Sequence, residues 1–198
     1  LAGILITHEH SDHIAGAYKF SRKYRLPIWM THGTLTGFAG DASDPPQINL
    51  IDCHSPFSIG ALQLLPFPVP HDAREPAHFV FTDGAHRLGV LTDTGSSTGH
   101  IEAMLSGCDA LVLECNHDFD LLMNGAYPQA LKARVAGRFG HLDNQTSAAL
   151  LASLDRSRLQ HLVAAHLSQQ NNTSELACQA LAQAMGCSPE WIAVADQD

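Results

Sequence analysis

A segment near the start of the chain, Thr7 to His13, is rich in side chains that bind metal ions. It reads Thr-His-Glu-His-Ser-Asp-His and directly follows an apolar run. Imidazole and carboxylate groups together suit zinc, manganese or iron. A loop at the end of a strand can aim alternate side chains in two directions. We therefore expect two metal ions, with His8 and His10 facing one and Asp12 and His13 facing the other.

Three later segments each place a potential ligand just after an apolar run that reads as a strand. These ligands are His71, Asp93 and His166. A single His or Asp in a turn is more often solvated or hydrogen-bonded to the backbone. Their order after the first motif instead favours the prediction that they complete the same metal centre.

The elements that must position these residues can be predicted from apolar periodicity. Strands are expected at 4–7, 27–31, 48–52, 61–68, 78–82, 87–92, 110–114, 159–164 and 191–194. Helical spacing is found around 14–23, 98–106, 128–138, 144–154 and 173–185. A strand-rich middle between flanks that alternate strand and helix predicts a layered α/β protein. No linker or repeat interrupts it, so we expect a single domain over residues 1–198.

Composition narrows the classes of function. The formal net charge is −9, which disfavours a protein that coats nucleic acid through a broad basic surface. It does not disfavour a nuclease, because bound metal ions supply positive charge where a phosphate sits. No apolar run reaches the roughly 18 residues of a membrane span. Five separated cysteines without a C-x-x-C pair favour a reduced, cytoplasmic protein.

The ligand order resembles that of the metallo-β-lactamase superfamily, which is H-x-H-x-D-H followed by His, Asp and His. All seven positions are present in this chain. The resemblance implies a four-layer αββα sandwich holding two divalent metal ions, zinc or manganese. It assigns one ion to His8, His10 and His71, the other to Asp12, His13 and His166, and makes Asp93 the bridge between them.

Two features qualify this resemblance. Lactamases proper use Cys or another arrangement where this chain has Asp93, which argues against antibiotic hydrolysis. Members of the fold also carry strands before the H-x-H-x-D-H loop, which here begins at residue 8. We expect a sandwich without its N-terminal strands and with an open sheet edge, in a truncated chain or one completed by a neighbouring chain.

Three further segments resemble the WalJ/YycJ-type exonuclease branch, described as 5′-to-3′ double-strand DNA exonucleases. They are Glu114 to Asp118, Gly140 to Asn144, and Ala165 to Asn172. They also parallel the Glu and His loops of the tRNA 3′-processing endonucleases. That parallel implies a catalytic pair consisting of Glu114 and His141.

Phosphodiester hydrolysis offers this pair a role. Cleavage requires an activated water, neutralised phosphoryl oxygens and a proton for the departing alkoxide. His141, oriented by Glu114, could supply that proton, because imidazole exchanges protons near neutral pH. The predicted catalytic residues are thus His141 and Glu114, together with the ligand Asp12. In the simpler alternative, His141 only starts a helix and Glu114 only contacts solvent.

Other polar residues receive structural interpretations. Glu9 and Ser11 are expected to face away from the metals or support them. Helix capping is expected of Asn144, Asn171 and Asn172, and a supporting position of His117 and Asp118. Solvated helix faces explain two basic clusters, one with Lys19, Arg22, Lys23 and Arg25, the other with Lys132, Arg134 and Arg138. Surface or core positions are expected of His32, His54, His78, His86, His100 and His161.

The favoured function is therefore a dinuclear metal-dependent nuclease acting on nucleic acid. A small-molecule or cyclic-nucleotide phosphodiesterase and a tRNA-processing-type endoribonuclease remain alternatives with the same ligands. A metal-binding scaffold without activity is the alternative outside the enzymes. The sequence leaves open the metal, the polarity of cleavage, the choice of DNA or RNA, and the oligomeric state.

Overall fold

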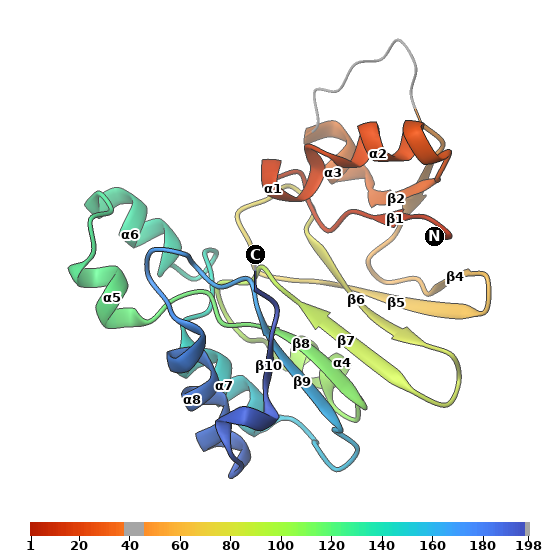
Figure 1. The fold of residues 1–198 in the computed structure, drawn as a ribbon. Coiled ribbons are helices and arrows are strands. Elements are labelled where there is room, and N and C mark those ends of the chain that lie inside the picture. The colour runs from red at the N-terminus through yellow and green to blue at the C-terminus, as the bar shows by residue number, and fades with distance from the viewer. Residues whose placement is uncertain (38–45, 197–198) are drawn as a thin grey trace.

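Two β-sheets form the centre of the molecule (Figure 1), in a computed structural model that describes residues 1–37 and 46–196. The smaller sheet is parallel and has the order β1-β2-β3. Its strands are Ile4–Leu5, Ile28–Thr31 and Ile48–Ile51. Strand β1 lies at an edge of this sheet among the described residues.

The larger sheet has the order β10-β9-β8-β7-β6-β5-β4. It is antiparallel from β4 to β7 and parallel from β7 to β10. Its strands are β4 Phe57–Ile59, β5 Leu62–Pro68, β6 Ala77–Thr82, β7 Arg87–Leu91, β8 Ala110–Glu114, β9 His161–Ala165 and β10 Ala193–Val194.

Helices cover the outer faces of both sheets (Figure 1). Those beside the smaller sheet are α1 Ser11–Ile14, α2 Ala17–Tyr24 and α3 His32–Gly37. Those beside the larger sheet are α4 Gly99–Leu105, α7 Asn144–Ser153 and α8 Ser174–Met185. The other helical segments are α5 Phe119–Asn124, α6 Gln129–Val135 and the short η1 Pro189–Trp191. The predicted αββα layering is confirmed, and no described helix is long and apolar enough to cross a bilayer.

Alternation along the strands separates the two faces of the larger sheet. In β8 and β9, Leu113 and Leu162 are buried in the cluster that includes residues of α4, α7 and α8. Val112 and Val163, which point to the opposite face, are only half-buried. The smaller sheet meets that face farther along, where Leu64 lies in a second buried cluster with partly buried side chains of the smaller sheet.

The predicted strands are all found, with ends that differ by at most two residues. The sequence missed β4, α3 and α5, which are three to six residues long and too short for a clear periodic signal. The single helix expected around 14–23 is two helices, because the chain breaks at Ala15 and Gly16 between α1 and α2. That break lets α1 carry part of the metal motif in a direction of its own.

The expectation that Asn144, Asn171 and Asn172 cap helices is wrong. The caps are Asp143, whose side chain accepts hydrogen bonds from two backbone amides of α7, and Thr173 before α8. Asn144 and Asn172 are buried and exchange two amide hydrogen bonds of 2.8 and 2.9 Å. Asn172 also donates to the Cys115 carbonyl at 2.7 Å. This amide pair ties the start of α7 to the segment before α8.

Replacing one asparagine of this pair should lower the free energy of unfolding by more than half of what replacing both would. Asn144→Ala removes two of the hydrogen bonds of the buried Asn172 side chain, so we expect about 2 kcal/mol of lost unfolding free energy. The double variant with Asn172→Ala should lose less than the sum of the two single variants, because both polar groups disappear together. Urea unfolding of the four proteins measures this coupling, and strictly additive losses would contradict it.

Candidate metal centre

Parallel strand ends bring three of the predicted residues to one edge of the larger sheet. Leu91, Leu113 and Ala164 are aligned in register across β7, β8 and β9. The residues that follow these positions, including Asp93, Glu114 and His166, therefore emerge at the same edge. Strand β5 runs in the same direction as β7, because two antiparallel pairings separate them. His71, three residues beyond β5, reaches this edge as well.

The Thr7 to His13 loop approaches from the smaller sheet. It follows β1, and the backbone amides of His13 and Ile14 bond to the His10 carbonyl as α1 begins. The Thr7 hydroxyl lies 3.0 Å from Nδ1 of His8 and 3.1 Å from Nδ1 of His13. Engaging both Nδ1 atoms leaves the Nε2 atoms of these two rings for a ligand. Thr7 is a supporting residue that the sequence did not single out.

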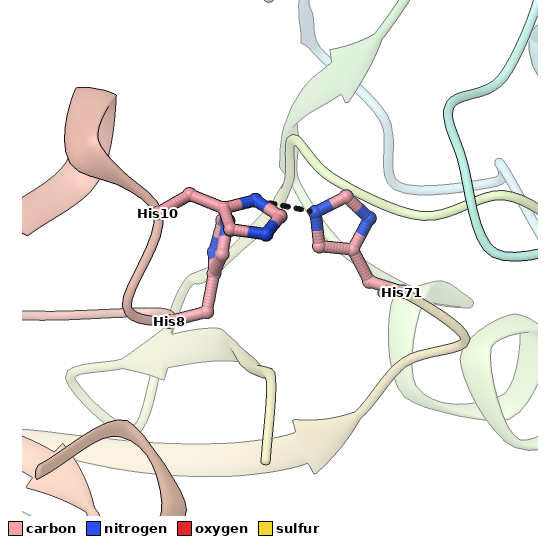
Figure 2. Close-up of side chains that lie close together, drawn as sticks. All are labelled: His8, His10 and His71. Atoms are coloured by element: carbon pink, nitrogen blue, oxygen red, sulfur yellow. Dashed lines mark hydrogen bonds between the residues drawn. The ribbon is translucent and has the colours of Figure 1, made fainter. Parts of the chain in front are cut away.

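His8, His10 and His71 form a compact group, with one nitrogen of each ring within 4.8 Å of the others. Figure 2 shows the His10 and His71 rings side by side, with planes inclined by 71° and His10 Nδ1 3.2 Å from His71 Nε2. His71 donates its Nδ1 hydrogen to the Gly140 carbonyl at 3.0 Å, so its Nε2 carries the lone pair of the ring and faces His10. The Nε2 atom of His8 is buried and has no hydrogen-bond partner.

Asp12, His13 and His166 form a second group within the same limit of 4.8 Å. Asp93 lies between the groups. Its Oδ2 is 3.2 Å from Nε2 of His13, and its Oδ1 is 3.5 Å from Nε2 of His166 and 3.9 Å from Nε2 of His71. All seven predicted ligands are thus brought together, in the two groups expected, with Asp93 placed to reach both.

The electrostatics of the group fit divalent cations. Burial, assisted by the nearby His13, lowers the pKa of His8 to about 2, so its ring is a neutral donor. Burial alone would raise the pKa of Asp93. The hydrogen bond with His13 and the charge of His166 outweigh burial and hold the pKa well below its usual range, so the carboxylate stays ionised. Burial lowers the pKa of His166, yet Glu114 and Asp93 outweigh it and raise the pKa to about 9. The site therefore favours positive charge.

Glu114 connects the catalytic prediction to the metal ligands. The side chain is fully buried, and its Oε1 accepts from Nδ1 of His141 at 2.8 Å and from Nδ1 of His166 at 3.0 Å. Its Oε2 accepts from the backbone amides of Thr94 and Leu142, both at 3.1 Å. The predicted contact with His141 is found, whereas the second contact, to His166, was not anticipated. The alternative that Glu114 is a solvent contact is wrong.

His166 has an unusual backbone. Its φ of 58° lies in the left-handed region, which costs a residue with a Cβ atom about 1 kcal/mol or more. The Asn116 side chain donates to the His166 carbonyl at 3.0 Å and helps to hold this conformation. Such conformations concentrate at functional sites. Here it turns the His166 ring towards Glu114 and Asp93.

The centre opens into a cleft of about 560 Å³. One wall carries Tyr127, Leu131 and Val135, which lie on α6 or just before it, and the other is a polar loop after β9. The lining residues are His10, Ser11, Asp12, Asp93, Asn116, Tyr127, Leu131, Arg134, Val135, His141, His166, Leu167, Ser168, Gln169, Gln170 and Asn171. His141 therefore stands between the buried Glu114 and an open space that a substrate can enter.

Arg134 is a second residue that the sequence missed, since it was interpreted as part of a solvated helix face. It lines the cleft, and among the lining residues it is the one permanent cation. Its Nε lies 2.5 Å from Oδ2 of Asp72, the residue that follows the ligand His71 in the sequence. This hydrogen bond uses Nε and leaves the two terminal amino groups available. A basic residue one position before the end of α6 was the available signal.

The remaining predictions can be checked against the same structure. Glu9 does not belong to the ligand groups and accepts a hydrogen bond from the Arg74 backbone amide at 2.8 Å. His117 is buried beside Asn116, 3.3 Å from its side-chain oxygen. His78 is fully buried in the core, and this burial lowers its pKa to about 4 and keeps the ring neutral. The exposed histidines are His32, His54, His86, His100 and His161.

A family model described as the β-lactamase superfamily domain matches residues 1–166 of this chain. The chain belongs to this superfamily. Among solved structures, this superfamily member resembles YhfI of Bacillus subtilis, a metallo-β-lactamase fold protein, with a TM-score of 0.75 and 15% identity. That match covers 99% of this chain and 75% of YhfI. Zinc-bound PqqB of Methylobacterium extorquens gives a TM-score of 0.69 at 19% identity, over 98% and 68% of the two chains.

Two curated members of the superfamily are more similar in sequence. Exodeoxyribonuclease YycJ of Bacillus anthracis is 34% identical over 187 residues, which are 93% of this chain and 71% of that protein. Exodeoxyribonuclease WalJ of Streptococcus pneumoniae is 32% identical over 181 residues, covering 89% and 67% of the two proteins. The resemblance to the WalJ/YycJ-type branch is confirmed.

Proposed function

We propose that this chain is a divalent-metal-dependent phosphodiesterase that degrades DNA, with the 5′-to-3′ polarity on duplexes described for the branch it resembles. One observation carries the proposal: His141, held by Glu114, lines a cleft beside two groups of metal-binding side chains. Two relatives above 30% identity are named exodeoxyribonucleases, which supports DNA as the substrate. We take residues 1–198 as one catalytic domain.

Seven residues would hold two metal ions, zinc or manganese. His8, His10 and His71 would bind one ion and Asp12, His13 and His166 the other, with Asp93 shared between them. When bound, such ions neutralise phosphoryl oxygens and activate water for attack. Thr7 and Glu114 fix the orientation of four of the rings through their Nδ1 atoms, as the supporting residues of metal sites commonly do.

His141 would act as the general acid. Its Nδ1 hydrogen is donated to Glu114, which fixes the orientation of the ring. The proton at Nε2 can then pass to the oxygen of the departing nucleotide. Asp12 lines the cleft with a side chain that is 64% exposed, so it would contact both a metal ion and the substrate. Glu114 would act through His141 and His166 as a positioning residue.

The cleft gives a strand of nucleic acid two kinds of contact. The aromatic ring of Tyr127 and the aliphatic side chains of Leu131 and Val135 offer an apolar surface to a nucleobase. Arg134, anchored by Asp72, presents charge to a phosphate. All five cysteines are free thiols, which is consistent with the reducing cytoplasm that we propose as the location.

A three-substrate assay tests this function. Purified protein with zinc or manganese is given labelled duplex DNA, a precursor tRNA and bis-nitrophenyl phosphate. Progressive shortening of DNA from one end is the expected result. Cleavage of the tRNA alone would favour the endoribonuclease alternative, and hydrolysis of the small ester alone a small-molecule phosphodiesterase. Metal binding without hydrolysis of any of the three would favour a scaffold.

Arg134→Ala should raise KM for DNA and lower kcat/KM about tenfold, because one charge-assisted hydrogen bond to a phosphate contributes about 1.5 kcal/mol or more. Arg138→Ala is the matched control, since its guanidinium lies 4.8 Å from the Phe139 ring centroid and does not line the cleft. Steady-state kinetics with metal content measured in parallel decides the matter. Equal losses in the two variants would contradict a specific role for Arg134.

A further inference from the structure

Helix α2 carries a basic surface that the cleft and the metal centre do not use. Four of the 11 Lys and Arg residues lie within seven positions here, and residues 13–40 contain no Asp or Glu. All four side chains are exposed. Within the described part of the chain, the arginine ion pairs are formed by Arg134 and Arg158 instead. We call this surface the α2 patch; it consists of Lys19, Phe20, Arg22, Lys23, Tyr24 and Arg25.

Two exposed aromatic rings lie among these cations. Phe20 and Tyr24 are 42% and 52% exposed, and their ring centroids are 4.6 Å apart. Lys23 Nζ lies 5.1 Å from the Tyr24 ring centroid. Cations beside exposed rings suit a nucleic-acid strand, because cations contact phosphates while rings contact sugars or stack on unpaired bases. Arg22 and Arg25 also line a recess of about 370 Å³ at the end of α2.

The patch lies on the helix that follows the rim of the cleft. Asp12, on α1, lines the cleft, and only Ala15 and Gly16 separate α1 from α2. Figure 1 shows α1 and α2 on the same outer layer, above the smaller sheet. Eight residues of α-helix extend over about 12 Å. A strand that leaves the cleft over α1 therefore meets the patch next.

We propose that the α2 patch binds the sugar–phosphate backbone of DNA whose end lies in the cleft. This inference rests on the proposed function. A protein with a formal net charge of −9 repels DNA on average, so binding requires a local group of cations. An anionic membrane surface would also attract these cations. DNA is favoured because the patch adjoins the cleft.

The double variant Arg22→Gln/Lys23→Gln tests the proposal. Binding to a phosphorothioate duplex that resists cleavage is followed by fluorescence anisotropy over a range of salt concentrations. We expect Kd to rise about tenfold and the salt slope to fall by about 0.9 for each phosphate that the variant no longer neutralises. Hydrolysis of bis-nitrophenyl phosphate should be unchanged, because it needs only the metal centre.

Helix α8 offers a control of matched charge. Gln179→Glu/Gln183→Glu makes the protein more negative by the same two charges, at exposed positions on another element. This variant should keep the DNA affinity and the salt slope close to those of the wild type. Equal weakening by the two double variants would overturn the proposal, since the effect would then come from net charge alone.

Arg25 provides a variant that separates binding from folding. It ends α2 with a φ of 53°, in the left-handed region where glycine is favoured. Arg25→Gly removes a charge and relieves the backbone, so we expect weaker DNA binding with an unchanged or higher Tm. A wild-type DNA affinity in this variant and in the Arg22→Gln/Lys23→Gln variant would overturn the proposal.

Two further outcomes show which of the two proposals fails. Loss of binding to phosphatidylserine vesicles by the Arg22→Gln/Lys23→Gln variant, with DNA binding intact, would identify a membrane surface and overturn the proposal. A wild-type protein that binds DNA through the patch but cleaves none would contradict the proposed nuclease function alone. The anisotropy assay does not depend on hydrolysis, so the two failures cannot be confused.

Discussion

Asp93→Asn is expected to remove bound metal and to lower hydrolysis of both DNA and bis-nitrophenyl phosphate by about a thousandfold. A shared carboxylate contributes several kcal/mol of charge stabilisation, and about 4 kcal/mol corresponds to that factor. Asp93 is 1% exposed and lies within 4 Å of His13, His71 and His166. Because the position is buried, water cannot compensate for the loss of its carboxylate. The asparagine keeps the volume and removes only the charge.

Metal analysis and thermal unfolding measure this prediction together. The wild type should contain two ions per chain. A chelator should lower its Tm, because metal bound only to the folded state stabilises that state. Asp93→Asn should contain little metal and respond little to chelator. Asp12→Ala, which alters one ligand group only, should retain about one ion. Two ions in Asp93→Asn, or a single ion unaffected by Asp12→Ala, would contradict the dinuclear centre.

His141→Ala should preserve metal content and lower turnover of DNA by roughly a hundredfold or more, the usual range for loss of a general acid. The loss should depend on the leaving group. A nitrophenolate departs without a proton, so bis-nitrophenyl phosphate should be hydrolysed almost normally. His141 lines the cleft and is not one of the seven assigned ligands, although its ring belongs to a further group of possible ligands with Asp93, Glu114 and His166. Metal content measured in the variant therefore separates loss of the acid from loss of a ligand.

Glu114→Gln is the informative comparison for His141→Ala. Glu114 holds both His141 and the ligand His166. Its replacement by glutamine should therefore impair the metal centre and reduce hydrolysis of both substrates. The two variants should therefore differ on bis-nitrophenyl phosphate. Equal losses of His141→Ala on both substrates would contradict acid catalysis. Normal turnover of DNA by that variant would return His141 to a purely structural role.

The ligand set could be predicted because each ligand follows a local apolar run. His71, Asp93 and His166 stand one to three residues beyond β5, β7 and β9, and the ends of similarly directed strands meet at one edge of a sheet. The same periodicity predicts a layered α/β protein, whereas the αββα order of the layers is what the resemblance to the superfamily implies. Short elements such as β4 could not be predicted, because three residues carry too little pattern to separate a strand from a turn.

Contacts between distant segments could not be predicted in the same way. Arg134 looks like an ordinary charged residue on α6, and its contact with Asp72 spans 62 positions of sequence. The amide pair of Asn144 and Asn172 was mistaken for two caps, because capping is a local rule that asparagine satisfies anywhere near a helix start. Its real partner depends on how α7 and the segment before α8 are placed.

The sequence by itself determined which side chains are available to bind metal, which strands carry them, and that a His and a Glu lie near the same sheet edge. Only the tertiary structure decided which atoms face one another. Glu114 Oε1 is shared by His141 and His166, and Thr7 by His8 and His13, because loops from separate strands converge within hydrogen-bond distance. Strand periodicity sets the face of a side chain, whereas partners within 3 Å are set by packing between elements that no local pattern relates.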